Sequence, residues 1–148
     1  MLKRDSKGFT LIELLIVVAI IGIIAAIAIP NLLNAIDRGK QKRTMADMRS
    51  LGTAVESYAV DNNVYPVATD AATLKGIVEA GAYIKNMPTA DGWNNTFQVA
   101  SATTQYTLYS FGKDNTGTSC ATGTTTTFND QICFINGQFL RYPAGSQQ

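Results

Sequence analysis

A long run of hydrophobic positions opens the chain. Residues 14–29 carry no charged or polar side chain, and the apolar segment that contains them extends over 25 residues, from Phe9 to Leu33. At about 1.5 Å per residue, a helix of this length can cross a hydrocarbon core of about 30 Å. A basic segment, residues 1–8, precedes it, and Lys and Arg favour the cytoplasmic side of a membrane. The pattern predicts one membrane-spanning helix with a cytoplasmic N-terminus.

The helical pattern continues beyond the apolar segment. Apolar residues recur at spacings of three and four, which is the period of one helix face; they are Met45, Met48, Leu51, Val55 and Tyr58. We therefore expect one helix from Phe9 to about Asp61, with this stripe packed on its own domain. A cleaved secretory signal would instead be followed by a turn and a cleavage region. Pro30 lacks a backbone N–H, so we expect a kink there.

Shorter elements follow. Tyr65-Pro66 is expected to end the long helix, and residues 71–80 predict a short helix. Segments rich in β-branched and aromatic residues predict strands; they are residues 96–100, 105–111, 131–135 and 138–142. Asn136-Gly137, between the last two, is typical of a hairpin turn, which needs positive φ at both positions. We expect an α+β fold in which a small antiparallel sheet packs on the long helix, with residues 115–127 in an exposed loop.

Composition and charge exclude several classes of function. The 148 residues include 12 Lys and Arg, 11 Asp and Glu, and no His. The balanced charge gives no basic surface for a nucleic acid, so we expect no nucleic-acid binding. The lack of His removes the commonest general base and catalytic metal ligand, and the sequence places no nucleophile beside a base. We therefore expect a protein that is not an enzyme.

Two cysteines flank the second half of a Thr-rich segment. An exported domain with two cysteines favours a disulfide, with two unpaired thiols as the alternative. A bridge between Cys120 and Cys133 would close a loop of 14 residues. In the chain-entropy model such a bridge contributes about 3 kcal/mol.

Glu13 lies inside the apolar segment, where a charge costs several kcal/mol. It either sits at the lipid headgroups with Lys7 or water, or it pairs with an amine at membrane depth. Removal of residues 1–8 would supply such an amine at Phe9, four positions before Glu13. The pair could form within one chain or between neighbouring copies, and in the second case it would set the stagger of an assembly.

These residues resemble those of a known family. The chain resembles type IV pilins and type II secretion pseudopilins in its class III leader and first helix, which read Lys7-Gly8-Phe9-Thr10-Leu11-Ile12-Glu13 and continue through Gly22 and Pro30. The resemblance implies that prepilin peptidase cleaves between Gly8 and Phe9 and N-methylates Phe9. It also implies that Glu13 aligns incoming subunits with the terminal amine of a neighbour, and that the helix bends or locally melts around Pro30 on assembly. The expected assembly residues are therefore Phe9, Glu13, Gly22 and Pro30.

The resemblance also implies how the chain is organised. We expect a cleaved leader (residues 1–8), a transmembrane and assembly helix (9–33), an amphipathic helix (34–61) and a globular head with a β-sheet and a C-terminal loop (62–148). The processed chain would form a homopolymeric filament. Its expected partners are prepilin peptidase, the inner-membrane assembly platform and minor pilins or pseudopilins. We expect it in the bacterial inner membrane before assembly, and in a periplasmic or extracellular filament afterwards.

Within this family, the head is most similar to the major pseudopilins of type II secretion. The similar segments are residues 83–88, 91–95 and 106–114, although Gly92 and Asn94 stand where a proline and a glycine are usual. The similarity implies a short filament that pushes folded substrates through an outer-membrane gate. A disulfide near the C-terminus is instead typical of type IVa pilins. The alternative is therefore a major or minor pilin of an extracellular type IV pilus, used in adhesion, twitching motility or DNA uptake. A membrane-anchored monomeric receptor would explain the anchor but not Glu13.

Major pseudopilins usually carry a Ca²⁺-binding loop near the C-terminus, and calcium is the one cofactor that the resemblance implies. Oxygen ligands could come from four side chains, together with backbone carbonyls; these are Asp114, Asn115, Asn129 and Asp130. The alternative is that these residues form turns and bond to their own backbone.

A basic cluster follows the anchor and consists of Arg38, Lys40, Lys42 and Arg43. Such a cluster is typical of a solvated helix face. It could also pair with acidic residues of a neighbouring subunit, namely Asp37, Asp47 or Glu56. Exposed pairs of this kind contribute only about 0–1 kcal/mol each.

Overall fold

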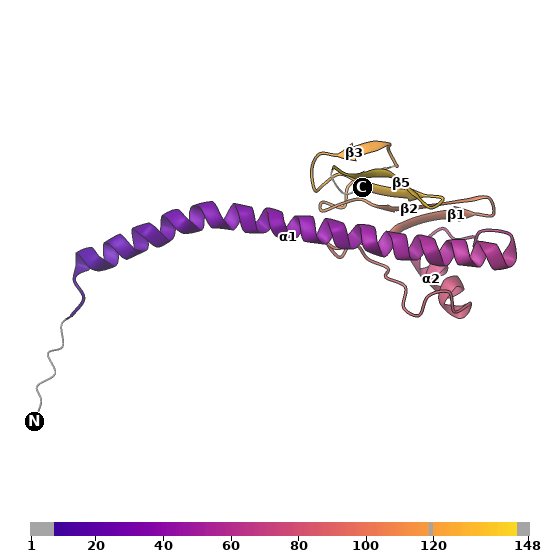
Figure 1. Ribbon diagram of the computed structural model, residues 1–148, viewed down its shortest axis with the longest axis horizontal. Helices are drawn as coiled ribbons and strands as arrows, with labels where there is room; N and C mark the ends of the chain where they lie inside the picture. The colour runs from indigo at the N-terminus through magenta and orange to yellow at the C-terminus, as the bar shows by residue number, and fades with distance from the viewer. Residues whose placement is uncertain (1–7, 119, 145–148) are drawn as a thin grey trace, which may run out of the picture. The chain divides into compact units, whose positions relative to one another are not determined.

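Helix α1 (Leu11–Asn62) is the longest element of the computed structural model, which describes residues 8–118 and 120–144 (Figure 1). It begins and ends within two residues of the predicted bounds. Pro30 lies inside the helix and does not end it; the expected kink stays a prediction. After Asn62, Asn63 adopts a φ of 59°, the left-handed conformation that commonly ends a helix.

The described residues fall into two compact units, with the boundary between Ile36 and Asp37. In the first unit, the large apolar side chains of α1 are exposed from Leu11 to Ile36. A helix that is hydrophobic all round needs an apolar environment around it. By length and composition, α1 is able to cross a membrane.

The second unit contains the rest of α1, the helix α2 and a five-stranded sheet. Helix α2 (Ala71–Ala80) begins after Asp70, whose Oδ1 accepts a hydrogen bond of 2.7 Å from the Thr73 backbone N–H. The strands are β1 (Gln98–Ala102), β2 (Gln105–Ser110), β3 (Gly123–Thr125), β4 (Ile132–Ile135) and β5 (Gln138–Pro143). Their order in the sheet is β1-β2-β4-β5-β3. The predicted short helix and the predicted strands are confirmed, with shifts of a few residues at their ends.

Strand β3 corrects two predictions. The sequence predicts a loop over residues 115–127 and an antiparallel sheet, whereas residues 123–125 form a strand that pairs in parallel with β5. The other strand pairs are antiparallel, so the sheet is mixed. β3 joins the sheet through its backbone, and its glycine and threonines give no hydrophobic alternation that would have identified a strand.

The core of the second unit lies between α1 and the sheet. Met45, Met48, Leu51 and Val55 are buried, which confirms the predicted stripe, and Tyr58 is half-buried. They share one hydrophobic cluster with side chains from α2 and the strands, among them Leu74, Val78, Phe97, Tyr106, Leu108, Ile132 and Phe134. The sheet and α2 therefore both pack on the C-terminal part of α1 (Figure 1).

The hairpin between β4 and β5 turns at the predicted residues. Asn136 and Gly137 have φ values of 45° and 83°, as a type I′ turn requires. Both also bond to Tyr106 of β2: its backbone N–H donates to Asn136 Oδ1 at 3.0 Å, and its hydroxyl accepts from the Gly137 N–H at 2.9 Å. Burial raises the pKa of the Tyr106 hydroxyl, so it stays protonated at any physiological pH.

Candidate functional site

Thr10 and Glu13 bond to each other at the start of α1. The backbone N–H and the hydroxyl of Thr10 both donate to Glu13 Oε2 at 2.8 Å, and the Glu13 N–H donates to Thr10 Oγ1 at 3.3 Å. This is a capping box, which satisfies N–H groups that the first turn of a helix leaves free. The Thr-x-x-Glu spacing is its sequence signal and would have identified Thr10 as a member of this site.

The cap leaves part of the Glu13 carboxylate available. Within the described part of the chain, Oε1 accepts no hydrogen bond and Glu13 takes part in no ion pair. A cation from outside could therefore contact Oε1 without breaking the bonds between Oε2 and Thr10. Gly8 and Phe9 on the N-terminal side of the cap are exposed, while Lys7 lies outside the described residues.

Gly22 and Pro30 lie on open stretches of the same helix. A Cβ added to Gly22 would have nothing within 4 Å. One position after Pro30, the Asn31 side-chain amide donates to the Ile27 carbonyl at 3.1 Å and adds a bond to this turn. The roles expected for Gly22 and Pro30 involve neighbouring copies, so they stay predictions.

In the second unit, Asp91 organises the loop of residues 91–95. Its Oδ1 accepts from the backbone N–H groups of Trp93 and Asn95, both at 2.9 Å, and its Oδ2 accepts from the Ser110 hydroxyl at 2.6 Å. Only 4% of Asp91 is exposed. This carboxylate therefore fixes the loop to the end of β2 and acts as a structural residue.

The two unusual residues of this loop fit its geometry. Gly92 donates its backbone N–H to Thr44 Oγ1 at 2.9 Å, and a Cβ at this position would collide with the Lys40 backbone on α1. Asn94 has a φ of 70°, and Asn adopts this left-handed region more readily than other residues with a side chain. Asn94 can therefore adopt the left-handed conformation that this loop has at that position.

Asp37 ties two loops to the start of the second unit. Its Oδ1 accepts from Trp93 Nε1 at 3.0 Å, and its Oδ2 lies 2.8 Å from Lys113 Nζ. The hydrogen bond from Lys113, and then that from Trp93, hold the pKa of the Asp37 carboxyl below its usual value. The sequence gives no local signal for this cluster, because its members are far apart in the chain.

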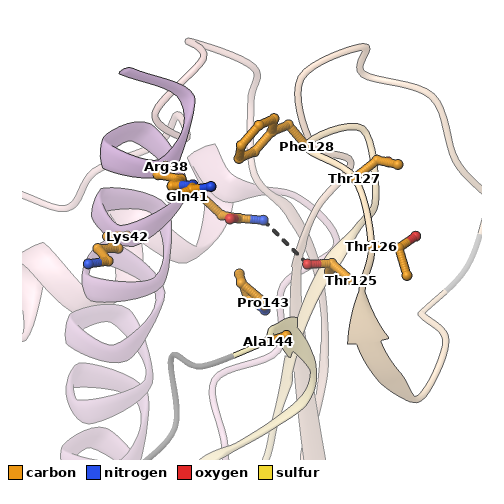
Figure 2. A pocket seen from close by; sticks show the side chains of 9 residues that line it. All are labelled: Arg38, Gln41, Lys42, Thr125, Thr126, Thr127, Phe128, Pro143 and Ala144. Carbon is orange, nitrogen blue, oxygen red and sulfur yellow. Dashed lines mark hydrogen bonds between the residues drawn. The ribbon is translucent and has the colours of Figure 1, made fainter. Parts of the chain in front are cut away.

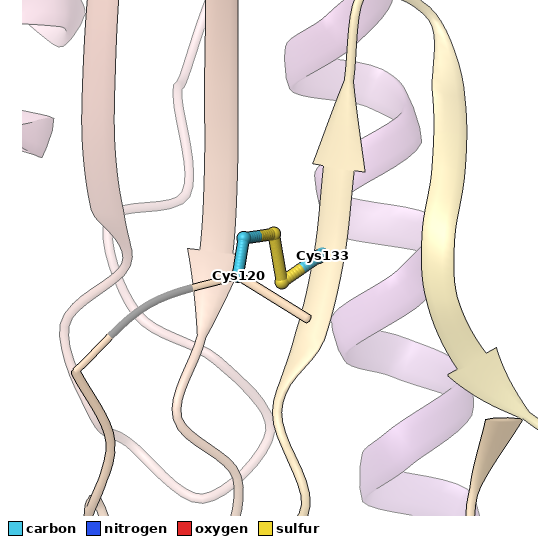
Figure 3. Close-up of a disulfide and its surroundings, with 2 residues drawn as sticks. All are labelled: Cys120 and Cys133. Carbon is cyan, nitrogen blue, oxygen red and sulfur yellow. A yellow bond between two sulfur atoms is a disulfide. The ribbon is translucent and has the colours of Figure 1, made fainter. Parts of the chain in front are cut away.

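The predicted disulfide is present. Cys120 and Cys133 are bonded, as Figure 3 shows, and no free cysteine is found among the described residues. Cys133 is completely buried in β4. The bridge therefore anchors one point of the polar segment before β3 to the centre of the sheet.

The candidate calcium ligands are engaged mainly with their own loops. Asp130 Oδ2 accepts from the backbone N–H groups of Thr126 and Thr127 at 2.6 and 2.7 Å, and Asp130 Oδ1 lies 3.0 Å from Arg141 Nη2. Asp114 Oδ1 accepts from the Thr116 N–H at 3.1 Å. Pairing with a guanidinium makes Asp130 less available to a calcium ion, and no group of three or more potential metal-binding His, Cys, Asp or Glu side chains occurs among the residues described.

The geometry therefore favours the turn interpretation for Asp114 and Asp130, while Asn115 and Asn129 are exposed. Calcium binding stays a prediction. Thermal melts with increasing calcium test it: a rise in melting temperature would support a site, and an unchanged value at millimolar calcium would remove it.

The acids expected to pair with a neighbouring subunit have partners within their own chain. Asp37 binds Lys113 and Trp93. Arg43 Nε lies 3.5 Å from Asp47 Oδ2, and Glu56 Oε2 accepts from the Tyr65 hydroxyl at 3.2 Å. These contacts make all three acids less available for pairing between subunits, which stays a prediction.

Comparison with known proteins matches both parts of the chain. The family model described as "Type II secretion system (T2SS), protein G" matches residues 31–127, and the one described as "Prokaryotic N-terminal methylation motif" matches residues 3–29. The first range contains the loop of Asp91 and its partners on α1, and the second contains Gly8, Phe9 and Glu13.

The individual relatives include type II secretion core proteins G and a type IV fimbrial protein. The type II secretion system core protein G of Aeromonas hydrophila is 34% identical over 111 residues, covering 68% of this chain and 77% of that protein. The core protein G of Vibrio cholerae is 35% identical over 109 residues, covering 66% and 73%. The type IV major fimbrial protein FimA of Dichelobacter nodosus is 37% identical over 123 residues, covering 79% of each chain. Because the first family model spans more than half of the residues, the chain belongs to the type II secretion system protein G family.

Proposed function

We propose that this chain is the major pseudopilin of a type II protein secretion system, a structural subunit that polymerises with copies of itself. One observation carries the proposal: an apolar helix begins with a carboxylate, Glu13, that keeps one oxygen unbonded within the described residues. Such a helix is costly in water, and such a carboxylate is costly in hydrocarbon. Assembly with other copies would bury the apolar helix and give the carboxylate a cationic partner.

Processing would create the partner of Glu13. Hydrolysis of the Gly8–Phe9 peptide bond by prepilin peptidase releases residues 1–8 and leaves an α-amine on Phe9. The peptidase then transfers a methyl group from an electrophilic methyl donor to this nitrogen, which loses one proton. The resulting secondary amine is a base and stays protonated near neutral pH.

The methylated Phe9 amine of one copy would pair with Glu13 Oε1 of the next, while Oε2 stays bonded to Thr10. The pair forms only at one stagger of the two helices, so it sets the register of the filament. Cohesion comes from burial of the exposed apolar side chains between Phe9 and Ile36. Gly22 allows close approach of a neighbouring helix, and Pro30 is the point where the helix can bend or melt.

The proposed location follows from the helix. The chain would lie in the bacterial inner membrane as a single-pass protein, with the N-terminus in the cytoplasm before processing. The assembly platform of that membrane and minor pseudopilins would then incorporate it into a short periplasmic filament.

An extracellular type IV pilus is the second candidate. The observation that favours it is the Cys120–Cys133 disulfide, which resembles the bridged loop of type IVa pilins, and one relative is a fimbrial protein. The chain would then be a pilin used in adhesion, twitching motility or DNA uptake.

Deletion of the gene distinguishes the two candidates when the secreted proteins and the sheared surface filaments are compared. Loss of secreted proteins with intact pili supports the pseudopilin. Loss of pili with normal secretion supports the pilin.

The role of Glu13 is tested by complementing the deletion with a Glu13→Leu variant. We expect a stable, processed membrane protein that forms no filament. Asp61→Asn, which neutralises an exposed carboxylate in the second unit, is the matched control and should assemble normally. Normal filaments from Glu13→Leu, or mature protein that still begins at Met1, would contradict the mechanism.

A further inference from the structure

The surface of the second unit contains a pocket of about 430 Å³ beside the first turns of α1 in that unit. Figure 2 shows Arg38, Gln41 and Lys42 of α1 on one side and Thr125, Thr126 and Thr127 on the other. Gln41 Nε2 donates to Thr125 Oγ1 at 3.4 Å, and both residues are buried. This bond joins the helix to β3 across the pocket.

Two positive charges of the pocket are uncompensated. Arg38 and Lys42 stand four positions apart, are exposed, and form no ion pair with any residue that the structure describes. The adjacent Asp37 is bonded to Lys113 and Trp93 instead. Asp130, near the threonines, is paired with Arg141. The Thr126 hydroxyl donates to Asp130 and the Thr125 hydroxyl is bonded to Gln41. The pocket therefore offers two cations and the Thr127 hydroxyl to an anion.

The place of these cations along α1 indicates which anion they meet. The exposed apolar side chains end at Ile36, two residues before Arg38. A hydrocarbon core of about 30 Å takes about 20 helical residues, and each headgroup layer adds about 5–7 Å, or four to five residues. Counted from Glu13, in the first turn of α1, this places Arg38 at the outer edge of the headgroup layer on the exported side. Lys42 lies one turn beyond that edge, and the Cα–Cβ bonds of a helix tilt toward its N-terminus, which here is the membrane side.

A lipid contact would also explain why basic residues follow the span on its exported side. Basic residues next to a membrane span usually lie on the cytoplasmic side, yet the basic cluster of Arg38, Lys40, Lys42 and Arg43 follows the span on its exported side. Anionic headgroups attract basic residues that lie close to a membrane surface. A built pocket at this depth can hold one phosphate between a helix and a loop.

We propose that the Arg38 and Lys42 pocket binds the phosphate of an anionic phospholipid headgroup while the subunit is in the membrane. The inference rests on the proposed membrane-anchored state and adds a lipid contact to it. Arg38 supplies several N–H donors and Lys42 an ammonium, and Thr127, whose hydroxyl makes no hydrogen bond within the described residues, adds a neutral donor.

The test uses the full processed chain in nanodiscs of phosphatidylcholine mixed with phosphatidylglycerol, and native mass spectrometry measures which lipid stays bound. We expect preferential retention of phosphatidylglycerol, and a decrease of about tenfold in that preference for Arg38→Gln/Lys42→Gln. The matched control is Lys75→Gln/Lys85→Gln, which removes the same charge elsewhere in the head and should keep the preference. Equal loss in both double variants, or none in the first, would overturn the proposal.

Two further experiments distinguish the lipid from other possible ligands of the pocket. Inorganic phosphate added to the nanodiscs should not displace the lipid; displacement at millimolar phosphate would mean a general anion site and would overturn the lipid assignment. If Arg38→Gln/Lys42→Gln keeps its lipid preference but no longer forms filaments, the pocket binds another copy and the proposal is wrong.

Failure of the proposed function would give a different result. A wild-type chain that retains the lipid but never polymerises contradicts assembly and leaves the lipid site in place.

Discussion

Asp37 Oδ2 and Lys113 Nζ lie 2.8 Å apart although the two residues are 76 positions apart in the sequence. The same carboxylate accepts from Trp93 Nε1 at 3.0 Å. One residue of α1 thus holds both the loop of Asp91 and the segment after β2. Asp37 is only 6% exposed, so its charge depends on these two donors.

Replacing Asp37 should destabilise the second unit more than replacing its partner. Asp37→Ala removes two hydrogen bonds to a charged group, each worth about 1.5–3 kcal/mol, and takes away the acceptor of the half-buried Trp93 indole N–H. Lys113→Ala should cost less, because it removes only one of these two bonds and leaves Asp37 bonded to Trp93. Urea unfolding of the full chain in detergent, followed by the fluorescence of the single tryptophan, measures both. A smaller loss for Asp37→Ala would contradict this account.

Acid should weaken the second unit below about pH 4. The pKa values of Asp37, Asp70 and Asp130 lie below those of ordinary aspartates, chiefly because Lys113 and the backbone N–H groups of Thr73 and Thr127 donate to the charged carboxylates. The unfolded chain therefore binds more protons, so their stabilisation is complete above about pH 5 and is lost as pH falls through the lowered values.

The unfolding free energy measured from pH 7 to pH 2 checks this, and Asp37→Asn should flatten its acid limb. The sequence contains no His, so we expect no transition near pH 6–7. A decline centred there would show that groups other than these carboxylates control the stability.

Two glycines of α1 should respond to alanine in opposite directions. A Cβ on Gly52 would collide with the buried Phe134 ring and lie 3.2 Å from the Tyr106 hydroxyl, whereas one on Gly39 has nothing within 4 Å. Gly52→Ala should therefore cost about 1–3 kcal/mol through overpacking. Gly39→Ala should stabilise the helix by up to about 1 kcal/mol. Urea unfolding of the two variants compares the same substitution in one helix, and equal effects would contradict the packing described around Gly52.

The elements that the sequence predicts are those with a local pattern. The stripe from Met45 to Tyr58 follows the helical period, and Asn136-Gly137 has the residue types that its turn requires. Strand β3 has no such pattern, because its pairing with β5 depends on the backbone. The same reason applies to Asp37, whose donors come from loops that only the folded sheet brings together.

The functional residues that the sequence predicts are likewise those with a local pattern. Gly8, Phe9 and Glu13 form a contiguous motif, and even Thr10 is visible in the Thr-x-x-Glu spacing. The sequence does not predict the pocket of Arg38 and Lys42, because the residues on its other side lie more than 80 positions later in the chain. The sequence identifies these two residues only as members of a basic cluster.

The Cys120–Cys133 disulfide should stabilise the head by restricting the unfolded chain. The cysteines are 13 positions apart, and closing a loop of this size is worth about 3 kcal/mol in the chain-entropy model. Because Cys133 is fully buried, alanine is a better replacement than serine, whose hydroxyl would need a partner.

Cys120→Ala/Cys133→Ala should keep the native far-UV circular dichroism but unfold at a lower urea concentration. Reduced wild-type protein should lose a similar amount, and reductant should leave the double variant unchanged. Equal stability of oxidised and reduced wild type would mean that the loop is already constrained without the bridge, and that the disulfide is not what holds the segment before β3 to β4.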